Sequence, residues 1–271
     1  MKAALLQLWA RLFARPRFVR LNRFLYTASL RGLGVLNFGS MQESGEHHFL
    51  ERLLAVYRSN SVQPVVLDVG ANVGNYAREI LAIERQVSIH CFEPHPANVA
   101  KLRQAVGSSV NVVPCAVGAD AGVLDLFDYA DEDGSSHASV YKEVFEKIHK
   151  RRHGSHPVDV VTIDDFLERE KIDRVALLKI DTEGHELSVL SGASMALASG
   201  RIDVVHFEFN EMNIASRTFI GDFFQALSGF QFFRLLPRGW LPVHDRPLEN
   251  IFAFQNIIAI RDGSRAHAAL I

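Results

Sequence analysis

Three acidic residues, Glu93, Asp181 and Glu208, each follow a short and mainly apolar run of the sequence. Such runs are predicted as buried strands, and the carboxyl ends of neighbouring parallel strands are where open α/β sheets bind ligands. A carboxylate at such a position can hydrogen-bond the hydroxyls of a ribose, or orient and deprotonate a reacting hydroxyl. The spacing of these acids therefore indicates a ligand site at one edge of a sheet.

A glycine-containing turn follows the first predicted strand, 65–69. Asp68 lies in this strand, and Gly70 and Gly74 complete the spacing D-x-G-x-x-x-G. Glycines let a backbone turn tightly and approach a ligand, and a following helix points free N–H groups at it. The spacing differs from the G-x-G-x-x-G of dinucleotide sites and favours another adenosine-containing ligand. The expected ligand contacts are Asp68, Gly70, Ala71, Asn72, Gly74 and Asn75, with Glu93 and Pro94 placed for the ribose.

The segments VLDVGANVGNYA, CFEPHP and LLKIDTEGHELSVLSGA resemble the FkbM-type family of class I S-adenosylmethionine-dependent methyltransferases, as do SGE at 44–46 and HFEF at 206–209. The resemblance implies S-adenosylmethionine as cofactor. It also implies a Rossmann-like α/β fold, a seven-stranded sheet in the order 3-2-1-4-5-7-6 with strand 7 antiparallel and helices on both faces. In this family pattern Ala116 and Val117 contact the adenine. Glu46 is expected on the cofactor side, or alternatively as an exposed acid of a first helical turn.

Methyl transfer is an in-line displacement, so the protein must chiefly align the acceptor with the methyl donor. Asp181 and Glu208 are the best candidates to orient or deprotonate an acceptor hydroxyl, with Asp181 beside the sulfonium and Glu208 on the acceptor. His185 and His206 are possible bases because imidazole titrates near neutrality. The alternatives are that His206 is a satisfied core histidine and that His185 begins an exposed helix face. Glu183 and Glu186 are alternatively first-turn acids of that helix.

Other chemistries are less well supported by the sequence. Asp181, Glu208 and Asn210 could offer oxygen ligands to Mg²⁺, but no zinc spacing is present and no metal is expected. Amino-methylating enzymes of nucleic acids carry a [DN]-P-P-[YF] turn after strand four, where this chain has Asp181-Thr182-Glu183-Gly184. The acceptor is therefore expected to be a hydroxyl of a sugar, glycolipid or polyketide-type molecule, with its identity and the oligomeric state left open. A cofactor-binding domain without activity and a nicotinamide-dependent oxidoreductase are the competing hypotheses.

The composition indicates one sizeable domain, with 271 residues and a formal net charge of −2. This balance gives no reason to expect a nucleic-acid partner. Cys91 and Cys115 are predicted to be buried free thiols, which favours a reducing, cytoplasmic location. No run is long enough to span a membrane. The predicted organisation is a basic N-terminal helical extension (1–43), the methyltransferase domain (44–261) and a C-terminal tail (262–271).

The extension has seven basic residues and no acid before Glu43. Apolar residues at helical spacing predict an amphipathic helix as far as Pro16. A cap packed on the domain, a contributor to the substrate pocket and a membrane-surface or targeting helix are the three open interpretations. Ser44 and Asp164 are each expected to cap a helix. The polar excursion 131–156, between two predicted hairpin strands, is either a solvated loop or a lid over the acceptor.

Overall fold

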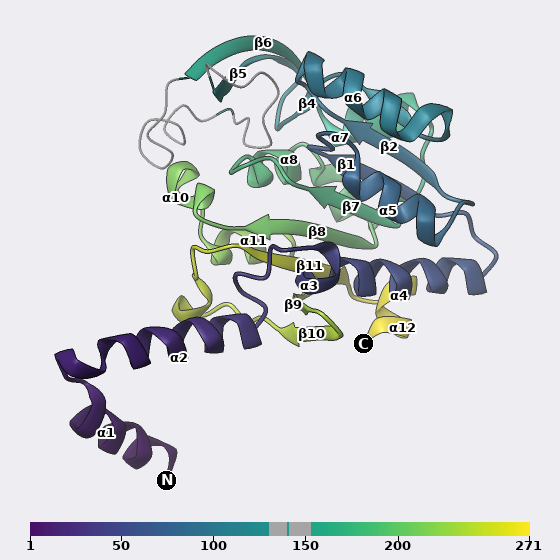
Figure 1. Cartoon of the computed structure of the whole chain (residues 1–271). Helices are drawn as coiled ribbons and strands as arrows, with labels where there is room; N and C mark the ends of the chain where they lie inside the picture. Colours follow the sequence, from purple (N-terminus) through teal and green to yellow (C-terminus); the bar gives the residue numbers. More distant parts are fainter. Residues whose placement is uncertain (130–139, 141–152) are drawn as a thin grey trace.

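The computed structural model describes residues 1–129, 140 and 153–271, which form a central sheet with helices on both faces (Figure 1). Its strands are β1 (Val65–Val69), β2 (Ser88–Phe92), β3 (Asn111–Val113), β7 (Leu177–Ile180), β8 (Val204–Phe209), β9 (Phe230–Leu236), β10 (Gly239–Pro242) and β11 (Gln255–Arg261). They lie in the order β10-β9-β11-β8-β7-β1-β2-β3, and β11 is antiparallel to both neighbours.

The α/β fold is as expected, and the predicted order 3-2-1-4-5-7-6 is present from β3 to β9. The predicted number of seven strands is wrong, because β10 adds an eighth strand at the edge. Gly239, at a φ of +127°, lets the chain turn back after β9 so that Trp240 pairs with Leu235. A glycine adopts such a φ without steric cost, so a tight hairpin forms here.

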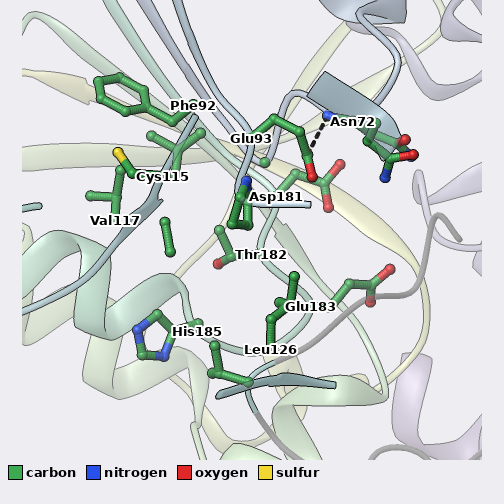
Figure 2. Close-up of a pocket in the computed structure, with 16 residues that line it drawn as sticks. Asn72, Phe92, Glu93, Cys115, Val117, Leu126, Asp181, Thr182, Glu183 and His185 are labelled. Carbon is green, nitrogen blue, oxygen red and sulfur yellow. Dashed lines mark hydrogen bonds between the residues drawn. The ribbon is translucent and has the colours of Figure 1, made fainter. Parts of the chain in front are cut away.

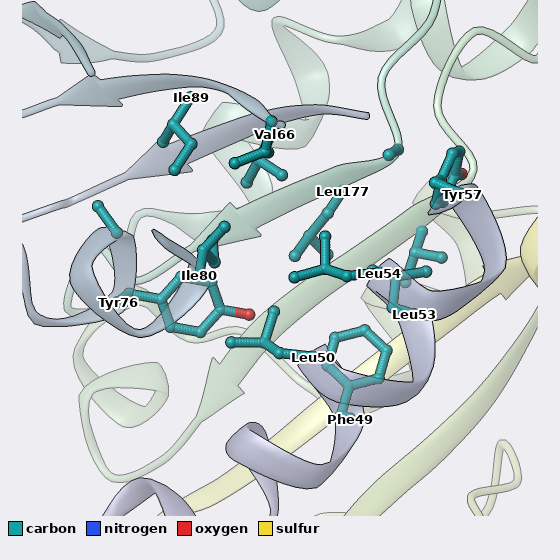
Figure 3. Close-up of a cluster of buried hydrophobic side chains, with 14 of the residues drawn as sticks. Phe49, Leu50, Leu53, Leu54, Tyr57, Val66, Tyr76, Ile80, Ile89 and Leu177 are labelled. Carbon is teal, nitrogen blue, oxygen red and sulfur yellow. The ribbon is translucent and has the colours of Figure 1, made fainter. Parts of the chain in front are cut away.

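The parallel strands are buried on both faces, which explains their continuous apolar runs. Alternate residues point to opposite sides, so Val66 and Leu177 enter one core while Leu67 and Leu178 enter the other. The first core is covered mainly by α4 (Glu46–Ser59), α5 (Asn75–Ile83), α6 (Pro96–Val106) and α12 (Arg265–Leu270), as Figure 3 shows for part of it. The second is covered by α7 (Ile163–Arg169), α8 (Glu186–Ser191), α9 (Ser194–Ala198) and α11 (Ile220–Ala226).

A second sheet of three strands stands beside the first in the order β4-β6-β5. The predicted hairpin is confirmed, with β5 (Gly122–Tyr129) antiparallel to β6 (His153–Val161), and β4 (Ala116–Val117) pairs with β6 in parallel. Residues 130–139 and 141–152 lie outside the described part of the chain. Of the predicted excursion 131–156, residues 153–156 belong to β6, so its predicted end is wrong. Whether the rest is a solvated loop or a lid stays a prediction.

Two predicted helix caps are wrong. Thr162, not Asp164, caps α7 by accepting a hydrogen bond from the Asp165 backbone N–H. Asp164 is instead buried, and its carboxylate accepts from two backbone N–H groups of α9, because the first turn of a helix leaves its donors unpaired. Gly45 rather than Ser44 precedes α4, and Ser44 ends the short helix α3 (Met41–Ser44).

The N-terminal segment forms α1 (Lys2–Phe13), the 3-10 turn η1 (Pro16–Phe18) and α2 (Val19–Gly32), which project from the domain (Figure 1). The predicted amphipathic helix before Pro16 is confirmed by α1. The interpretation as a cap packed on the domain is wrong, since α1 has no buried residue and α2 has only Leu30. Among the described residues no helix is long and apolar enough to cross a membrane.

Candidate active site

Three adjoining pockets open along the carboxyl ends of the parallel strands. All three are lined by Gly70, Asn72 and Asp181, so they form one cleft around the turn after β1. The apolar pocket, of about 600 Å³, also has Phe92, Glu93, Val117 and Leu126 in its walls. The acidic pocket, of about 880 Å³, has Glu46, Asp68, Lys179 and Glu208. The outer pocket, of about 1040 Å³, has Phe38, Glu208, Asn210 and Phe254.

Glycine is needed at the two positions of the turn for different structural reasons. Gly70 has a φ of +80°, and a Cβ there would lie 1.8 Å from the carbonyl oxygen of Asp181. It therefore lets the turn pass directly beside the end of β7. Gly74 has a φ of +83°, but a Cβ there would lie 2.6 Å from Leu102 Cδ1, and the residue lines none of the three pockets. We expected a ligand to approach the backbone at Gly74. The structure shows instead that the start of α5 packs closely on α6 there.

Glu93 lies at the end of β2, beside the apolar pocket (Figure 2). Its carboxylate accepts from the backbone N–H groups of Asn72 (2.8 Å) and His95 (2.9 Å), which fixes its orientation. Burial raises the pKa of this carboxyl to about 7, although both N–H groups favour the charged form. A fixed carboxylate next to apolar walls offers what a nucleoside needs, an acceptor for ribose hydroxyls and a slot for a flat base.

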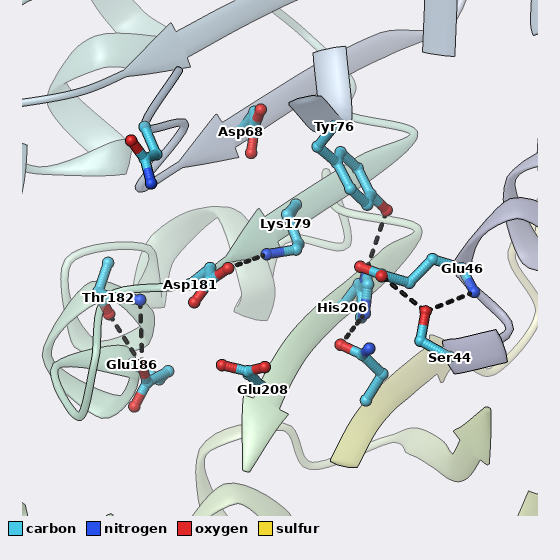
Figure 4. Close-up of polar contacts among 12 residues, drawn as sticks. Ser44, Glu46, Asp68, Tyr76, Lys179, Asp181, Thr182, Glu186, His206 and Glu208 are labelled. Atoms are coloured by element: carbon cyan, nitrogen blue, oxygen red, sulfur yellow. Dashed lines mark hydrogen bonds and ion pairs between the residues drawn. The ribbon is translucent and has the colours of Figure 1, made fainter. Parts of the chain in front are cut away.

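Lys179 is a site residue that the sequence analysis did not single out. Its Nζ lies 3.0 Å from Asp181 Oδ2 and 5.3 Å from the ring centre of Tyr76 (Figure 4). The Lys179 side chain is 5% exposed and that of Asp181 is 39% exposed, so the carboxylate faces the cleft and the ammonium lies behind it. A lysine inside the otherwise apolar strand Leu177–Ile180 was the available signal.

The charge of Lys179 is maintained by the surrounding carboxylates. Burial alone would lower its pKa, but Asp181, Glu46, Asp68 and Glu208 together raise it. Within the described part of the chain, Lys179 is the one cation that lines the acidic pocket, so the carboxylates around it repel one another. Burial raises the pKa of Asp68 to about 6, and burial together with the charges of Asp181 and Glu183 raises the pKa of Glu208.

Glu46 and Glu208 are each held by a neighbouring polar side chain. Ser44 Oγ donates to Glu46 Oε2 at 2.7 Å, and Asn210 Nδ2 donates to Glu208 Oε2 at 3.0 Å. Glu46 faces the acidic pocket rather than open solvent, and burial raises its pKa. Glu208 lies within β8 rather than after it, paired with Asn256 of β11, and borders both the acidic and the outer pocket. The structure thus brings Asp181 and Glu208 together across two shared pockets.

The two histidines occupy different places. His206 is fully buried and makes 2.9 Å contacts with the Tyr76 hydroxyl and with Asn256 Oδ1. Burial lowers its pKa to about 3, so it is a neutral core histidine, as the alternative interpretation held. His185 lines the apolar pocket with Val117 and neither of the pockets that Asp181 shares with Glu208 (Figure 2). Burial lowers the pKa of His185 to about 4.

Glu186 has a structural role that the sequence analysis did not assign. Its carboxylate is buried and accepts from the Thr182 backbone N–H (3.2 Å), the Thr182 hydroxyl (3.2 Å) and the Gly184 backbone N–H (3.0 Å). Glu186 is the first-turn acid of α8, as the alternative interpretation held, whereas Glu183 lies before this helix. By closing this turn, Glu186 fixes the backbone that follows Asp181.

The remaining predicted contacts divide between the pockets. Pro94, Ala116 and Val117 line the apolar pocket, and Ala71 and Asn75 line the acidic pocket. Asn210, one of the hypothetical magnesium ligands, has its Oδ1 2.7 Å from the Met212 backbone N–H that donates to it. Among the described residues, no group of three His, Cys, Asp or Glu side chains is arranged to hold a metal ion.

One family model matches more than half of the chain. The family model described as the methyltransferase FkbM domain matches residues 68–233. The 2-O-methyltransferase NoeI of Sinorhizobium fredii is 24% identical over 193 residues, which cover 65% of this chain and 76% of the relative. The 31-O-demethyl-FK506 methyltransferase FkbM of Streptomyces tacrolimicus is 31% identical over 184 residues, 56% of this chain and 71% of the relative. Among solved structures, the METTL16 MTase domain aligns with a TM-score of 0.46 at 10% identity, covering 93% of this chain and 82% of that one.

Proposed function

The chain belongs to the FkbM family of S-adenosylmethionine-dependent methyltransferases, and we propose that it methylates a hydroxyl oxygen of a small-molecule acceptor. The observation that carries the proposal is the position of Asp181. It lines all three pockets, its carboxylate is partly exposed to the cleft, and the buried Lys179 holds it from behind. A carboxylate placed in this way can align a hydroxyl and receive its proton.

The cleft has groups that suit both the adenosine part and the methionyl part of the cofactor. Glu93 would accept from the ribose hydroxyls, and Ala116 and Val117 would border the adenine in the apolar pocket. Glu46 and Asp68, in the acidic pocket, would bind the ammonium group of the methionyl part. When bound, the cofactor supplies an electrophilic methyl group on a positively charged sulfur. The excess of carboxylates over cations in the acidic pocket favours that positive charge.

The chemical work of the protein is then mainly alignment. In the proposed reaction the acceptor oxygen forms a bond to the methyl carbon while the bond from that carbon to sulfur breaks. Asp181 holds the hydroxyl by accepting its hydrogen bond and takes the proton as the new bond forms. Lys179, with its Nζ 3.0 Å from Asp181 Oδ2, keeps this carboxylate oriented. Glu208, across the outer pocket, binds the acceptor rather than the cofactor.

The outer pocket supports an acceptor that has both hydroxyls and apolar surface. Phe38 and Phe254 lie edge to face with ring centres 6.0 Å apart, and Glu208 and Asn210 supply polar groups. Sugars, glycolipids and polyketide-type molecules combine these features. The names of two relatives specify transfer to oxygen, which agrees with this choice. The turn Asp181–Gly184 departs from the [DN]-P-P-[YF] of amino-methylating enzymes, which favours oxygen over nitrogen.

The domain division remains part of the proposal. We assign catalysis to residues 44–261, with 1–43 as an extension. Within 1–43, Phe38 and Met41 line the cleft, whereas no residue of α1 does. The apolar residues Ala266 and Leu270 of the tail are buried in the first core, so the tail contributes to the stability of the domain.

The test is transfer from S-adenosylmethionine labelled with ¹³C in its methyl group. The purified full chain would be incubated with hydroxylated sugars, glycolipids and macrolides, and products identified by mass and by the carbon chemical shift of an O-methyl group. Asp181→Asn, checked for folding by circular dichroism, is the matched control and should give little product. Label found on nitrogen, on a nucleic acid or on a protein, with none on a hydroxyl, would overturn the proposal.

A further inference from the structure

The helices α1 and α2, with the turn η1 between them, form an N-terminal arm (residues 2–32) whose apolar side chains lie in the open. Leu5, Leu6, Leu8, Trp9 and Leu12 of α1 are 42–63% exposed. Phe24 of α2 is 68% exposed. Monomeric proteins rarely expose a continuous apolar patch of this kind without a partner for it.

The apolar residues of α1 share one face of the helix. Leu5, Leu8 and Leu12 recur at a spacing of three and four residues, with Trp9 beside them, while Gln7 and Arg11 point to the opposite side. Such a helix presents a stripe of leucine and tryptophan along one side and polar groups along the other. This is the pattern of helices that lie in the plane of a membrane surface.

The arm has a defined shape of its own. The Trp9 and Phe13 rings stack with centres 4.3 Å apart, and Phe13 meets Phe18 of the turn at 5.0 Å. The Asn22 side chain donates to the Phe13 carbonyl oxygen at 2.9 Å, which ties the end of α1 to α2. The apolar and basic side chains of the two helices are therefore presented together.

The charge of the arm is opposite to that of the rest of the chain. Residues 1–42 contain seven Lys or Arg and no acidic residue, so the remaining residues hold 22 of the 29 basic residues and all 31 acidic ones. The formal net charge is thus near +7 for the arm and near −9 for the rest of the chain. A strongly basic segment attached to an acidic body is attracted to an anionic surface while the body is repelled from it.

We propose that the N-terminal arm binds the surface of an anionic membrane, with Leu8, Trp9 and Leu12 in the acyl boundary and the arginines at the lipid phosphates. A second copy of the chain fits less well, because two arms would bring like charges together. The acidic body of a second copy offers the arm charge but little apolar surface. Outside the arm, the described large apolar side chains that are exposed are spread over several separate elements, as Val123, Met195 and Leu248 are.

The position of the arm gives this binding a consequence for the cleft. The chain leaves α2 and reaches Phe38 within a few residues, and Phe38 lines both the acidic and the outer pocket. A bound arm would therefore hold the mouth of the outer pocket close to the membrane. The binding itself does not depend on the proposed methyl acceptor and can be tested without one.

The first experiment is flotation of the full chain with vesicles. Strong binding is expected with vesicles of phosphatidylglycerol and phosphatidylcholine, falling as salt is raised, and weak binding with phosphatidylcholine alone. The triple variant Arg11→Gln, Arg15→Gln, Arg20→Gln should bind about 100-fold more weakly, since each basic residue strengthens binding about fivefold. The matched control, Arg85→Gln, Arg103→Gln, Arg238→Gln, removes three exposed arginines of the body and should bind as the parent does.

The second experiment places a reporter in the apolar face. In a Trp240→Phe background Trp9 is the sole tryptophan, and its emission should shift to the blue when anionic vesicles are added. Leu8→Ser with Leu12→Ser should remove the shift. Equal binding to neutral and anionic vesicles, no shift of Trp9, or a dimer in sedimentation that Leu8→Ser dissociates would each overturn the proposal.

Discussion

Acidic side chains lie at both ends of the strand pair β7 and β8, and the balance of charge around them is opposite at the two ends. At the amino end, Asp203 is fully buried and accepts from the Tyr57 hydroxyl (2.5 Å), Arg174 Nε (3.0 Å) and Arg261 Nη2 (3.2 Å). Two cations and a hydroxyl thus meet one carboxylate. This end is electrostatically satisfied before any ligand is present.

At the carboxyl end the balance is reversed. Asp181, Glu208, Glu46 and Asp68 act on a single cation, Lys179, and the pKa of each of the last three acids is raised. The amino end therefore stabilises the fold, while the carboxyl end retains unbalanced negative charge that a positively charged ligand can neutralise. Because strand direction is shared, the same pair of strands separates a stabilising acid from the acids to which we assign catalysis and binding.

Asp203→Asn should have the largest effect and should act on stability alone. It leaves Arg174 and Arg261 without a counter-charge at a buried position, which we expect to cost roughly 3 kcal/mol, at the low end for a broken buried pair because both arginines reach solvent. Urea unfolding measures the loss. The Kd for S-adenosylmethionine of the folded variant should match that of the parent, and weaker binding without loss of stability would reverse the assignment of the two ends.

Asp181→Asn should lower kcat by about 100-fold or more, the typical loss for a positioned proton acceptor. The midpoint of urea unfolding should change little, because the variant also removes one of the repelling charges around Glu208. Steady-state kinetics with and without EDTA is the measurement. Full activity would remove Asp181 from the mechanism, and activity abolished by EDTA and restored by Mg²⁺ would favour the metal hypothesis.

Lys179→Met should lower kcat about tenfold, because Asp181 then lacks the ion pair that orients its carboxylate toward the acceptor. Steady-state kinetics is the measurement, and the KM for the acceptor should change little. A purely structural role of Lys179 would lower the free energy of unfolding without lowering kcat of the folded enzyme. Lys179→Arg keeps the charge and serves as the control, with a kcat close to that of the parent.

Glu208→Gln should raise the KM for the acceptor up to about tenfold with kcat nearly unchanged. The raised pKa of Glu208 means that its carboxyl binds a proton readily, and glutamine resembles that neutral form. The comparison with Asp181→Asn separates acceptor binding from the chemical step. A fall in kcat as large as that of Asp181→Asn would assign the proton acceptor to Glu208.

Cofactor affinity should rise roughly fivefold between pH 6 and pH 8, the smallest of the expected effects. The pKa values of Asp68 and Glu93 in the free protein are raised to about 6 and about 7. A bound cation and ribose hydroxyls favour the ionised carboxylates, so binding releases protons and strengthens as pH rises through these values. Calorimetry in buffers of different ionisation enthalpy counts the protons. Proton uptake on binding would contradict the charge assignment of the carboxyl end.

The sequence by itself determined the features that depend on neighbouring residues. Continuous apolar runs identified the main strands, and the alternation in 122–129 identified a hairpin strand. The glycine turn with Glu93 predicted where the cofactor binds, and the structure places both beside one cleft. Seven basic residues without an acid defined the N-terminal arm. Periodicity, turn residues and local charge depend only on residues that are close in the sequence, so a single sequence is enough to predict their consequences.

Only the tertiary structure decided which groups meet across the chain. Tyr76 and His206 are 130 residues apart in the sequence, and Asn256 is a further 50 residues on. Lys179 gains its role from carboxylates on three other elements, and Gly74 is required by Leu102 of α6 rather than by a ligand. Burial and charge balance depend on every neighbour in space, whatever its sequence separation. For this reason only the tertiary structure shows that Asp203 meets two arginines while Asp181 and Glu208 share one lysine.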